Sequence, residues 1–179
     1  MSMESRMTAQ ELLKHARHDY MNTLHLLQMQ LDLGMDDSVR ETIDAAVEKG
    51  RHESMLAGLD MPATAEWLLT FGWRFPEYEQ AMTVTVESPG NPDADRWTER
   101  FLEALFGTLS DRLSPYAEYR AGIHVESREP GWLIEFDLEG PFGMEGDLPE
   151  PGDDAPFEVE LNSSEEGLKL IVAGRKVDR

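Results

Sequence analysis

Two apolar stripes with helical spacing occupy the first third of the 179-residue chain and limit what it can fold into. The first stripe recurs at steps of three, four or seven residues and consists of Leu13, Tyr20, Leu24, Leu27 and Leu31. The second consists of Val39, Ile43, Ala46, Val47, Met55, Leu56 and Leu59. Because a surface helix buries one apolar face, this pattern predicts two long amphipathic helices.

The ends of both helices carry recognisable signals. Thr8 lies three residues before Glu11, which is the spacing of a capping box, so we expect the first helix to begin there. Gly34 followed by Met-Asp-Asp supplies a stop and a new N-cap, and Pro62 closes the resulting antiparallel hairpin. One hairpin cannot fully bury both stripes. We therefore expect a homodimer in which two chains form a four-helix bundle.

The sequence changes character after Pro62, which divides the chain into an expected helical domain at 1–62 and a second domain at 63–179. The pattern in the second domain predicts helices at 64–75 and 96–114, the latter with Trp97, Phe101, Leu105, Leu109 and Leu113 on one face. It also predicts strands at 82–88, 121–129, 131–140, 156–163 and 167–174, with a hairpin around Pro130. The expected fold class is a helical hairpin joined to an α+β domain whose sheet is covered by helices on one face.

The composition excludes several classes of protein. Hydrophobic residues make up 40% and charged residues 29%, which is typical of a globular chain. The formal net charge is −20 with no cluster of Lys and Arg, which argues against nucleic-acid binding. There is no cysteine, and no apolar run approaches the roughly 20 residues of a membrane span. We therefore expect a cytoplasmic protein with no membrane segment.

Titratable side chains are concentrated in the first helix, in the stretch "HARHDYMN" at 15–22. His15, His18 and Asn22 share a ridge because helical neighbours lie three and four residues apart, and Arg17 and Asp19 flank it. His18 points away from the leucine stripe toward solvent. Asp19 can fix the imidazole tautomer, and Arg17 can neutralise part of a phosphoryl group. His18 is thus a candidate nucleophile.

Other interpretations of these histidines stay open on spacing alone. A histidine on a surface helix commonly has no function. A metal could also join His15 with His18, or His18 with His25, although helical metal pairs favour a separation of four residues with added carboxylates. His52 and His124 have no partner pattern, and we interpret them as structural.

Four segments resemble the sporulation initiation phosphotransferase B family: "HARHDYMNTLHLLQMQLDLG" at 15–34, "RHESMLAGL" at 51–59, "WLLTFGWR" at 67–74 and "FDLEGPFG" at 136–143. The first segment is also similar to the dimerisation helices of citrate- and fumarate-type sensor kinases. The resemblance implies that His18, directly before the aspartate, is the phosphorylated residue and that His15 is not. Asp19 would support His18, and the face around it would dock the partners, with Arg17, Asn22 and His15 at the rim.

The resemblance further implies a phosphorelay in sporulation initiation. His18 would accept a phosphoryl group from the aspartate of one response regulator receiver domain and pass it to a second. The chain would need no cofactor of its own, since the regulator supplies the magnesium. The second domain would be a degenerate form of the ATP-binding domain of histidine kinases.

Two alternatives remain. A histidine autokinase would need magnesium-ATP, which kinases hold with asparagines on a helix. Aligning "LFGTLSDRL" at 105–113 with that helix puts Thr108 and Arg112 where the two asparagines would lie. An arginine there places a positive charge where the cation should bind. "DLEG" at 137–140 lacks the kinase spacing, and the acidic stretch at 143–154 would repel phosphates. The other alternative is a non-catalytic dimeric scaffold for response regulators.

Overall fold

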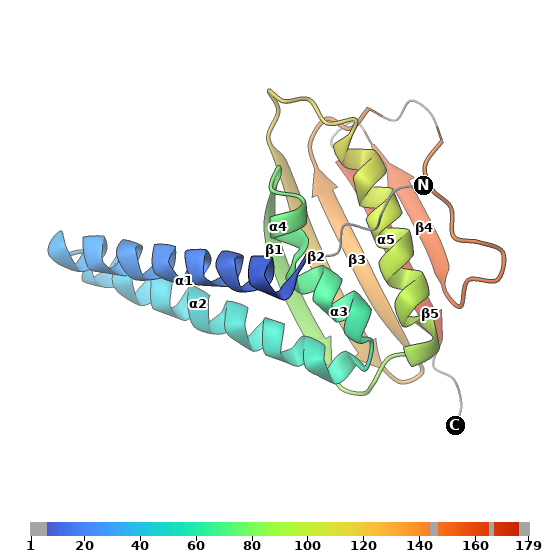
Figure 1. The fold of residues 1–179 in the computed structure, drawn as a ribbon, viewed down its shortest axis with the longest axis horizontal. Helices are drawn as coiled ribbons and strands as arrows, with labels where there is room; N and C mark the ends of the chain where they lie inside the picture. The colour runs from blue at the N-terminus through green and yellow to red at the C-terminus, as the bar shows by residue number, and fades with distance from the viewer. Residues whose placement is uncertain (1–6, 144–146, 165–166, 176–179) are drawn as a thin grey trace. The chain divides into compact units, whose positions relative to one another are not determined.

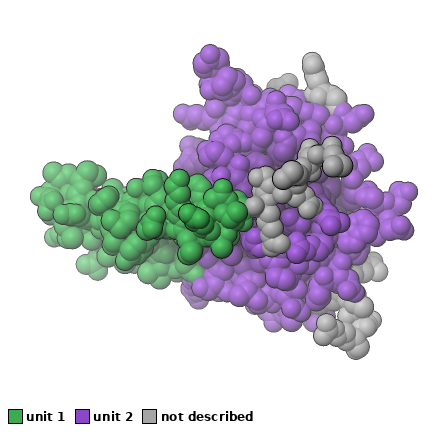
Figure 2. All heavy atoms as spheres, viewed as in Figure 1, with its two compact units in different colours: residues 1–50 green, residues 51–179 purple. Residues whose placement is uncertain are grey.

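The computed structural model describes residues 7–143, 147–164 and 167–175. It divides into two compact units, Met1–Gly50 and Arg51–Arg179, which Figure 2 shows in green and purple. The expected domains at 1–62 and 63–179 are segments that would fold independently of each other, and their boundary after residue 62 stays a prediction. None of the helices in the described ranges has the length and apolarity that a membrane-spanning segment needs.

The first unit is built from α1 (Ala9–Asp32) and most of α2 (Asp36–Met55), which run antiparallel in Figure 1. The capping box is present: the backbone N–H of Glu11 donates to Thr8 Oγ1 at 3.3 Å, and the N–H of Thr8 donates to Glu11 Oε2 at 2.8 Å. Gly34 adopts the left-handed region with φ +69° in the connection. Gln30 and Thr42 exchange side-chain hydrogen bonds of 3.0 and 3.1 Å across the hairpin. The predicted hairpin is confirmed.

The apolar stripes are uncovered within α1 and α2, whereas Leu56 and Leu59, expected to continue the second stripe, lie in the short helix η1 (Leu56–Leu59) and are buried in the core of the second unit. Along α1 and α2, all of whose residues the structure describes, no side chain is buried. Leu13 is 71% exposed and Leu31 is 59% exposed. Burying a leucine side chain fully contributes roughly 1.5–3 kcal/mol. A second apolar surface is therefore needed to bury this stripe and gain that free energy. The expected homodimer stays a prediction.

The second unit is a sheet with helices on one face (Figure 1). Its helical elements are η1 (Leu56–Leu59), α3 (Pro62–Leu69), α4 (Phe71–Arg74), η2 (Pro92–Ala94) and α5 (Asp95–Ser110). Its strands are β1 (Tyr78–Val86), β2 (Tyr119–Arg128), β3 (Gly131–Glu139), β4 (Glu158–Ser163) and β5 (Gly167–Arg175). The sheet order is β1-β2-β3-β5-β4, in which only β1 and β2 pair in parallel. The expected α+β class and the hairpin around Pro130 are confirmed.

The helices of the second unit differ from the sequence prediction in two boundaries and in the exposure of one side chain. The single helix expected at 64–75 is two helices, because Thr70 leaves the helical conformation with φ −99° and ψ 2°, and its hydroxyl donates to the Glu66 carbonyl. The helix expected at 96–114 ends at Ser110. Trp97, expected on the buried face of that helix, is 47% exposed although Asp95 and Thr98 in the same turn are buried, because it lies about 100° around the helix from Thr98, outside the arc that faces the core.

The core lies between the sheet and the helices α3, α4 and α5. Burial alternates along β2 and β3, so one sheet face is buried and the other is open. Phe106 of α5 packs 4.9 Å from the Phe136 ring and 5.0 Å from the Phe71 ring, measured between centroids. Trp67 of α3 joins this cluster at 5.5 Å from Phe106. Aromatic packing of this kind holds the helical layer on the sheet.

A buried carboxylate fixes α3 against α5. Asp95 accepts hydrogen bonds from the backbone N–H groups of Ala63 at 3.0 Å and Thr64 at 2.7 Å. The Thr64 hydroxyl donates to the Asp95 carbonyl oxygen at 3.0 Å. These N–H groups belong to the first turn of α3, where no intrahelical acceptor exists, and a negative charge there also suits the helix dipole.

Candidate functional site

His18 lies in the middle of α1 with its imidazole directed to solvent. Its side chain is 70% exposed, as the spacing predicts. Nδ1 lies 3.4 Å from Asp19 Oδ1. No hydrogen bond to Nε2 exists within the part of the chain that the structure describes. The ring therefore offers Nε2 to an incoming group while Nδ1 faces the carboxylate.

Asn22 contacts the same ring nitrogen one turn further along the helix. Its Nδ2 atom lies 3.2 Å from His18 Nδ1. A carboxylate only accepts, so the Asp19 contact requires a proton on Nδ1, whereas an amide nitrogen donates to an unprotonated Nδ1. The two contacts thus favour opposite tautomers. Asp19 stabilises the tautomer whose lone pair is on Nε2, which is the exposed nitrogen.

The remaining predicted site residues lie on the preceding turn. His15 is three residues before His18 and is partly buried, and Arg17 is exposed beside it. At about 100° per residue, Arg17 lies roughly a quarter-turn around the helix from the imidazole. The roles expected for His15, Arg17, Asp19 and Asn22 stay predictions.

Within the described ranges, no group of three or more His, Cys, Asp or Glu side chains is arranged to hold a metal ion. His25, the possible metal partner of His18, is seven residues away along α1 and exposed.

The two histidines interpreted as structural have partners that the sequence did not reveal. His52 Nδ1 lies 3.1 Å from the backbone nitrogen of Val84 and 3.3 Å from its oxygen, so the end of α2 meets strand β1. His124 Nδ1 lies 2.9 Å from Thr83 Oγ1, and its Nε2 lies 3.6 Å from Glu126 Oε2. Val84 and Thr83 lie 32 and 41 residues from their histidines, where periodicity gives no signal, whereas Glu126 is two residues from His124 on the same strand.

The residues considered for an ATP site are not brought together. Arg112 donates through Nη2 to the carbonyl oxygen of Asp147 at 2.8 Å, and Thr108 bonds the Ala104 carbonyl. Asp137 lies between the buried Phe136 and Leu138, so its side chain projects from the open sheet face, opposite the face that α5 covers.

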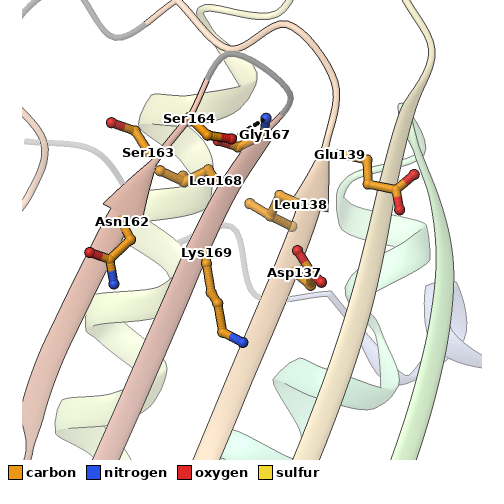
Figure 3. A pocket seen from close by; sticks show the side chains of 9 residues that line it. All are labelled: Asp137, Leu138, Glu139, Asn162, Ser163, Ser164, Gly167, Leu168 and Lys169. Carbon is orange, nitrogen blue, oxygen red and sulfur yellow. Dashed lines mark hydrogen bonds between the residues drawn. The ribbon is translucent and has the colours of Figure 1, made fainter.

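Asp137 lines a shallow hollow of about 480 Å³ at the ends of β3, β4 and β5 (Figure 3). Lys169 projects into the same region, where its Nζ lies 2.9 Å from Glu135 Oε1. The hydrogen bond and charge of Glu135 raise the pKa of Lys169 above its usual value. Lys169 is therefore charged and forms an ion pair with Glu135 on the open face of the sheet.

Residues 1–59 match the family described as sensor kinase SpoOB-type, alpha-helical domain. The N-terminal part of the chain is thus similar to a SpoOB-type alpha-helical domain. This segment contains His18, Asp19 and Asn22, and it ends at Leu59 in η1. The family resemblance predicted from the residues is confirmed.

A curated relative extends the similarity beyond the SpoOB-type domain. The chain is 29% identical over 133 residues to sporulation initiation phosphotransferase B of Bacillus subtilis (strain 168), which covers 73% of this chain and 69% of that protein. The chain is a homologue of that phosphotransferase.

Solved structures with a similar arrangement include the histidine kinase AdeS of Acinetobacter baumannii and a bacterial phosphotransferase. AdeS shares 15% identity with a TM-score of 0.41, covering 88% of this chain and 97% of AdeS. The bacterial phosphotransferase shares 11% identity with a TM-score of 0.40, covering 96% of this chain and 100% of that protein.

Proposed function

We propose that this chain is a histidine phosphotransferase of a sporulation phosphorelay. It accepts a phosphoryl group on His18 from the aspartate of one response regulator and passes it to the aspartate of another. The observation that carries the proposal is the exposed His18 of a SpoOB-type domain, with Asp19 at Nδ1 and Nε2 open to solvent.

The transfer is an in-line displacement at phosphorus. The Nε2 lone pair forms the N–P bond, and the P–O bond to the donor aspartate breaks, so the electron pair leaves on that carboxylate. The phosphorylated ring keeps the Nδ1 proton and carries a positive charge, which Asp19 offsets. The second step is the same displacement with a receiver aspartate as the attacking group.

The partners follow from this chemistry. Response regulator receiver domains would dock on the α1 face around His18, with Arg17, Asn22 and His15 at its rim. We propose that two chains pair through the exposed apolar stripes of α1 and α2, which supports a homodimeric four-helix bundle. The charge of −20 disfavours nucleic acid as a partner.

The proposal includes no cofactor for this chain. Magnesium is expected in the acidic pocket of the receiver domain, where it stabilises the charge of the transferred group. We place the protein in the cytoplasm, where response regulators act.

The test compares two phosphoryl donors. Purified protein is incubated with a labelled phosphorylated receiver domain, and separately with labelled ATP and magnesium, and acid-labile, base-stable label on the chain is measured. Label from the receiver alone supports the phosphotransferase. Label from ATP would restore the autokinase, and no label from either would favour the scaffold.

A further inference from the structure

The second unit contains an apolar groove between α5 and β4, closed on one side by the loop at 147–151. The groove has a volume of about 730 Å³. Its apolar lining comes from α5, β4 and the loop and consists of Phe101, Leu105, Leu148, Pro149, Pro151, Val159 and Leu161. In Figure 1, β4 is the edge strand farthest from β1, and α5 crosses the face of the sheet next to it.

The charged side chains that line the groove are both acidic. Asp147 and Glu150 stand on the loop, and both are exposed to solvent. The loop continues into Asp153 and Asp154, also exposed, and none of the described residues that line the groove is Lys or Arg. The groove therefore combines an apolar interior with a negatively charged rim.

The loop is held in place, so the rim is a formed feature. The Arg112 guanidinium donates to the Asp147 carbonyl oxygen at 2.8 Å, which ties the loop to the residues following α5. Leu148 packs partly buried against the main core. The Asp147 and Glu150 side chains are exposed beside this anchored backbone.

An exposed indole lies at one end of the groove. Trp97 is one helical turn before Phe101 on α5. A Cβ atom added at Gly152 would lie 3.6 Å from a ring carbon of Trp97, and Gly152 directly follows Pro151, which lines the groove. Tryptophan at the edge of an apolar pocket is a frequent anchor in protein interfaces, and its ring face attracts Arg and Lys side chains.

These features select the chemistry of the occupant. A phosphate-bearing ligand would meet two carboxylates and no Lys or Arg among the described residues that line the groove, and a second copy of this chain would bring a surface of the same negative sign. We propose that the groove docks a segment of a partner protein in which Arg or Lys lies next to an apolar anchor side chain. This site does not include His18, and the inference does not rest on the proposed phosphotransfer.

The test follows the Trp97 indole by NMR in the full-length chain, with Trp97→Phe used to assign its signal. The probe is the peptide acetyl-Arg-Leu-Ser-Arg-Leu-Ser-amide. Matched peptides replace Arg by Glu, or Leu by Ser. We expect a saturable shift of the Trp97 signal with the first peptide only, because charge and an apolar anchor are both required.

Two pairs of amide substitutions separate groove binding from general charge attraction. Asp147→Asn with Glu150→Gln should weaken the peptide at least about tenfold. Glu87→Gln with Glu118→Gln removes the same charge from exposed positions outside the groove and should change affinity less than about twofold.

Three outcomes would overturn the inference. Equal loss in both variant pairs would mean unspecific attraction to an acidic protein. Binding of magnesium-ATP that shifts Trp97 would assign the groove to nucleotide. The absence of a saturable shift with the first peptide would show that the groove does not take this class of partner.

Discussion

The amide of Asn22 lies 3.2 Å from Nδ1 of His18, the same ring nitrogen that faces Asp19 at 3.4 Å. One neighbour favours a proton on Nδ1, and the other favours its absence. The tautomer of His18 is therefore set by the competition between these two side chains, and the reactive form is the one that Asp19 stabilises.

Asn22→Ala removes the donor that competes for Nδ1. We expect the Nδ1-protonated tautomer of the neutral ring to become more populated. The ¹⁵N chemical shifts of the His18 ring measure this directly above the pH at which the ring loses its charge. Gln28→Ala, an exposed amide ten residues along α1, is the control. A tautomer ratio unchanged in Asn22→Ala would mean that water, and not Asn22, contacts Nδ1.

Asp19→Asn should slow phosphoryl transfer to His18. The variant loses the carboxylate that stabilises the reactive tautomer and the charged phosphorylated ring. We expect the single-turnover rate to fall at least about tenfold, equivalent to ~1.4 kcal/mol in the barrier. Asp32→Asn, at the end of the same helix, should transfer at the wild-type rate. A normal rate in Asp19→Asn would remove the carboxylate from the mechanism.

Leu31→Glu tests the pairing of two hairpins. Leu31 is 59% exposed in the single chain and lies on the apolar stripe of α1. If this stripe forms the centre of a four-helix bundle, a charge there must be buried without a partner, and the dimer should dissociate. Light scattering should give the mass of one chain for Leu31→Glu and of two chains for Gln28→Glu. A dimeric Leu31→Glu protein would argue against this stripe as the interface.

Asp95→Ala should destabilise the second unit by about 1–3 kcal/mol, because the N–H groups of Ala63 and Thr64 lose their buried acceptor. Urea unfolding measures the loss. Asp93→Ala, an exposed aspartate two residues earlier, should change the stability by less than about 0.5 kcal/mol. Equal effects in the two variants would mean that the Asp95 contacts contribute little.

Local patterns predicted the hairpin accurately. The capping box at Thr8, the glycine turn at Gly34 and the exposed position of His18 all depend on neighbours within a few residues. The contacts of Asp95 with α3 and of His52 with Val84 join residues 31 or 32 positions apart, and helical spacing carries no information about them. Trp97 shows a related limit, since periodicity predicts that a helix has a buried face but not how wide that face is around the helix.

The order of the strands in the sheet also could not be predicted from local sequence patterns. Strands were expected at nearly all the observed positions, but β1 begins at Tyr78, before the alternating stretch at 82–88. Its parallel pairing with β2 crosses 41 residues, as between Tyr78 and Tyr119, and depends on α5 covering the shared face.

The most direct measurement of the central claim is transfer of label from a phosphorylated receiver domain to His18→Ala and His15→Ala, each checked as folded and of wild-type mass. The account predicts no label on His18→Ala and near-normal label on His15→Ala, because only His18 has Nε2 exposed with Asp19 at Nδ1. Label retained by His18→Ala, or lost only from His15→Ala, would contradict it.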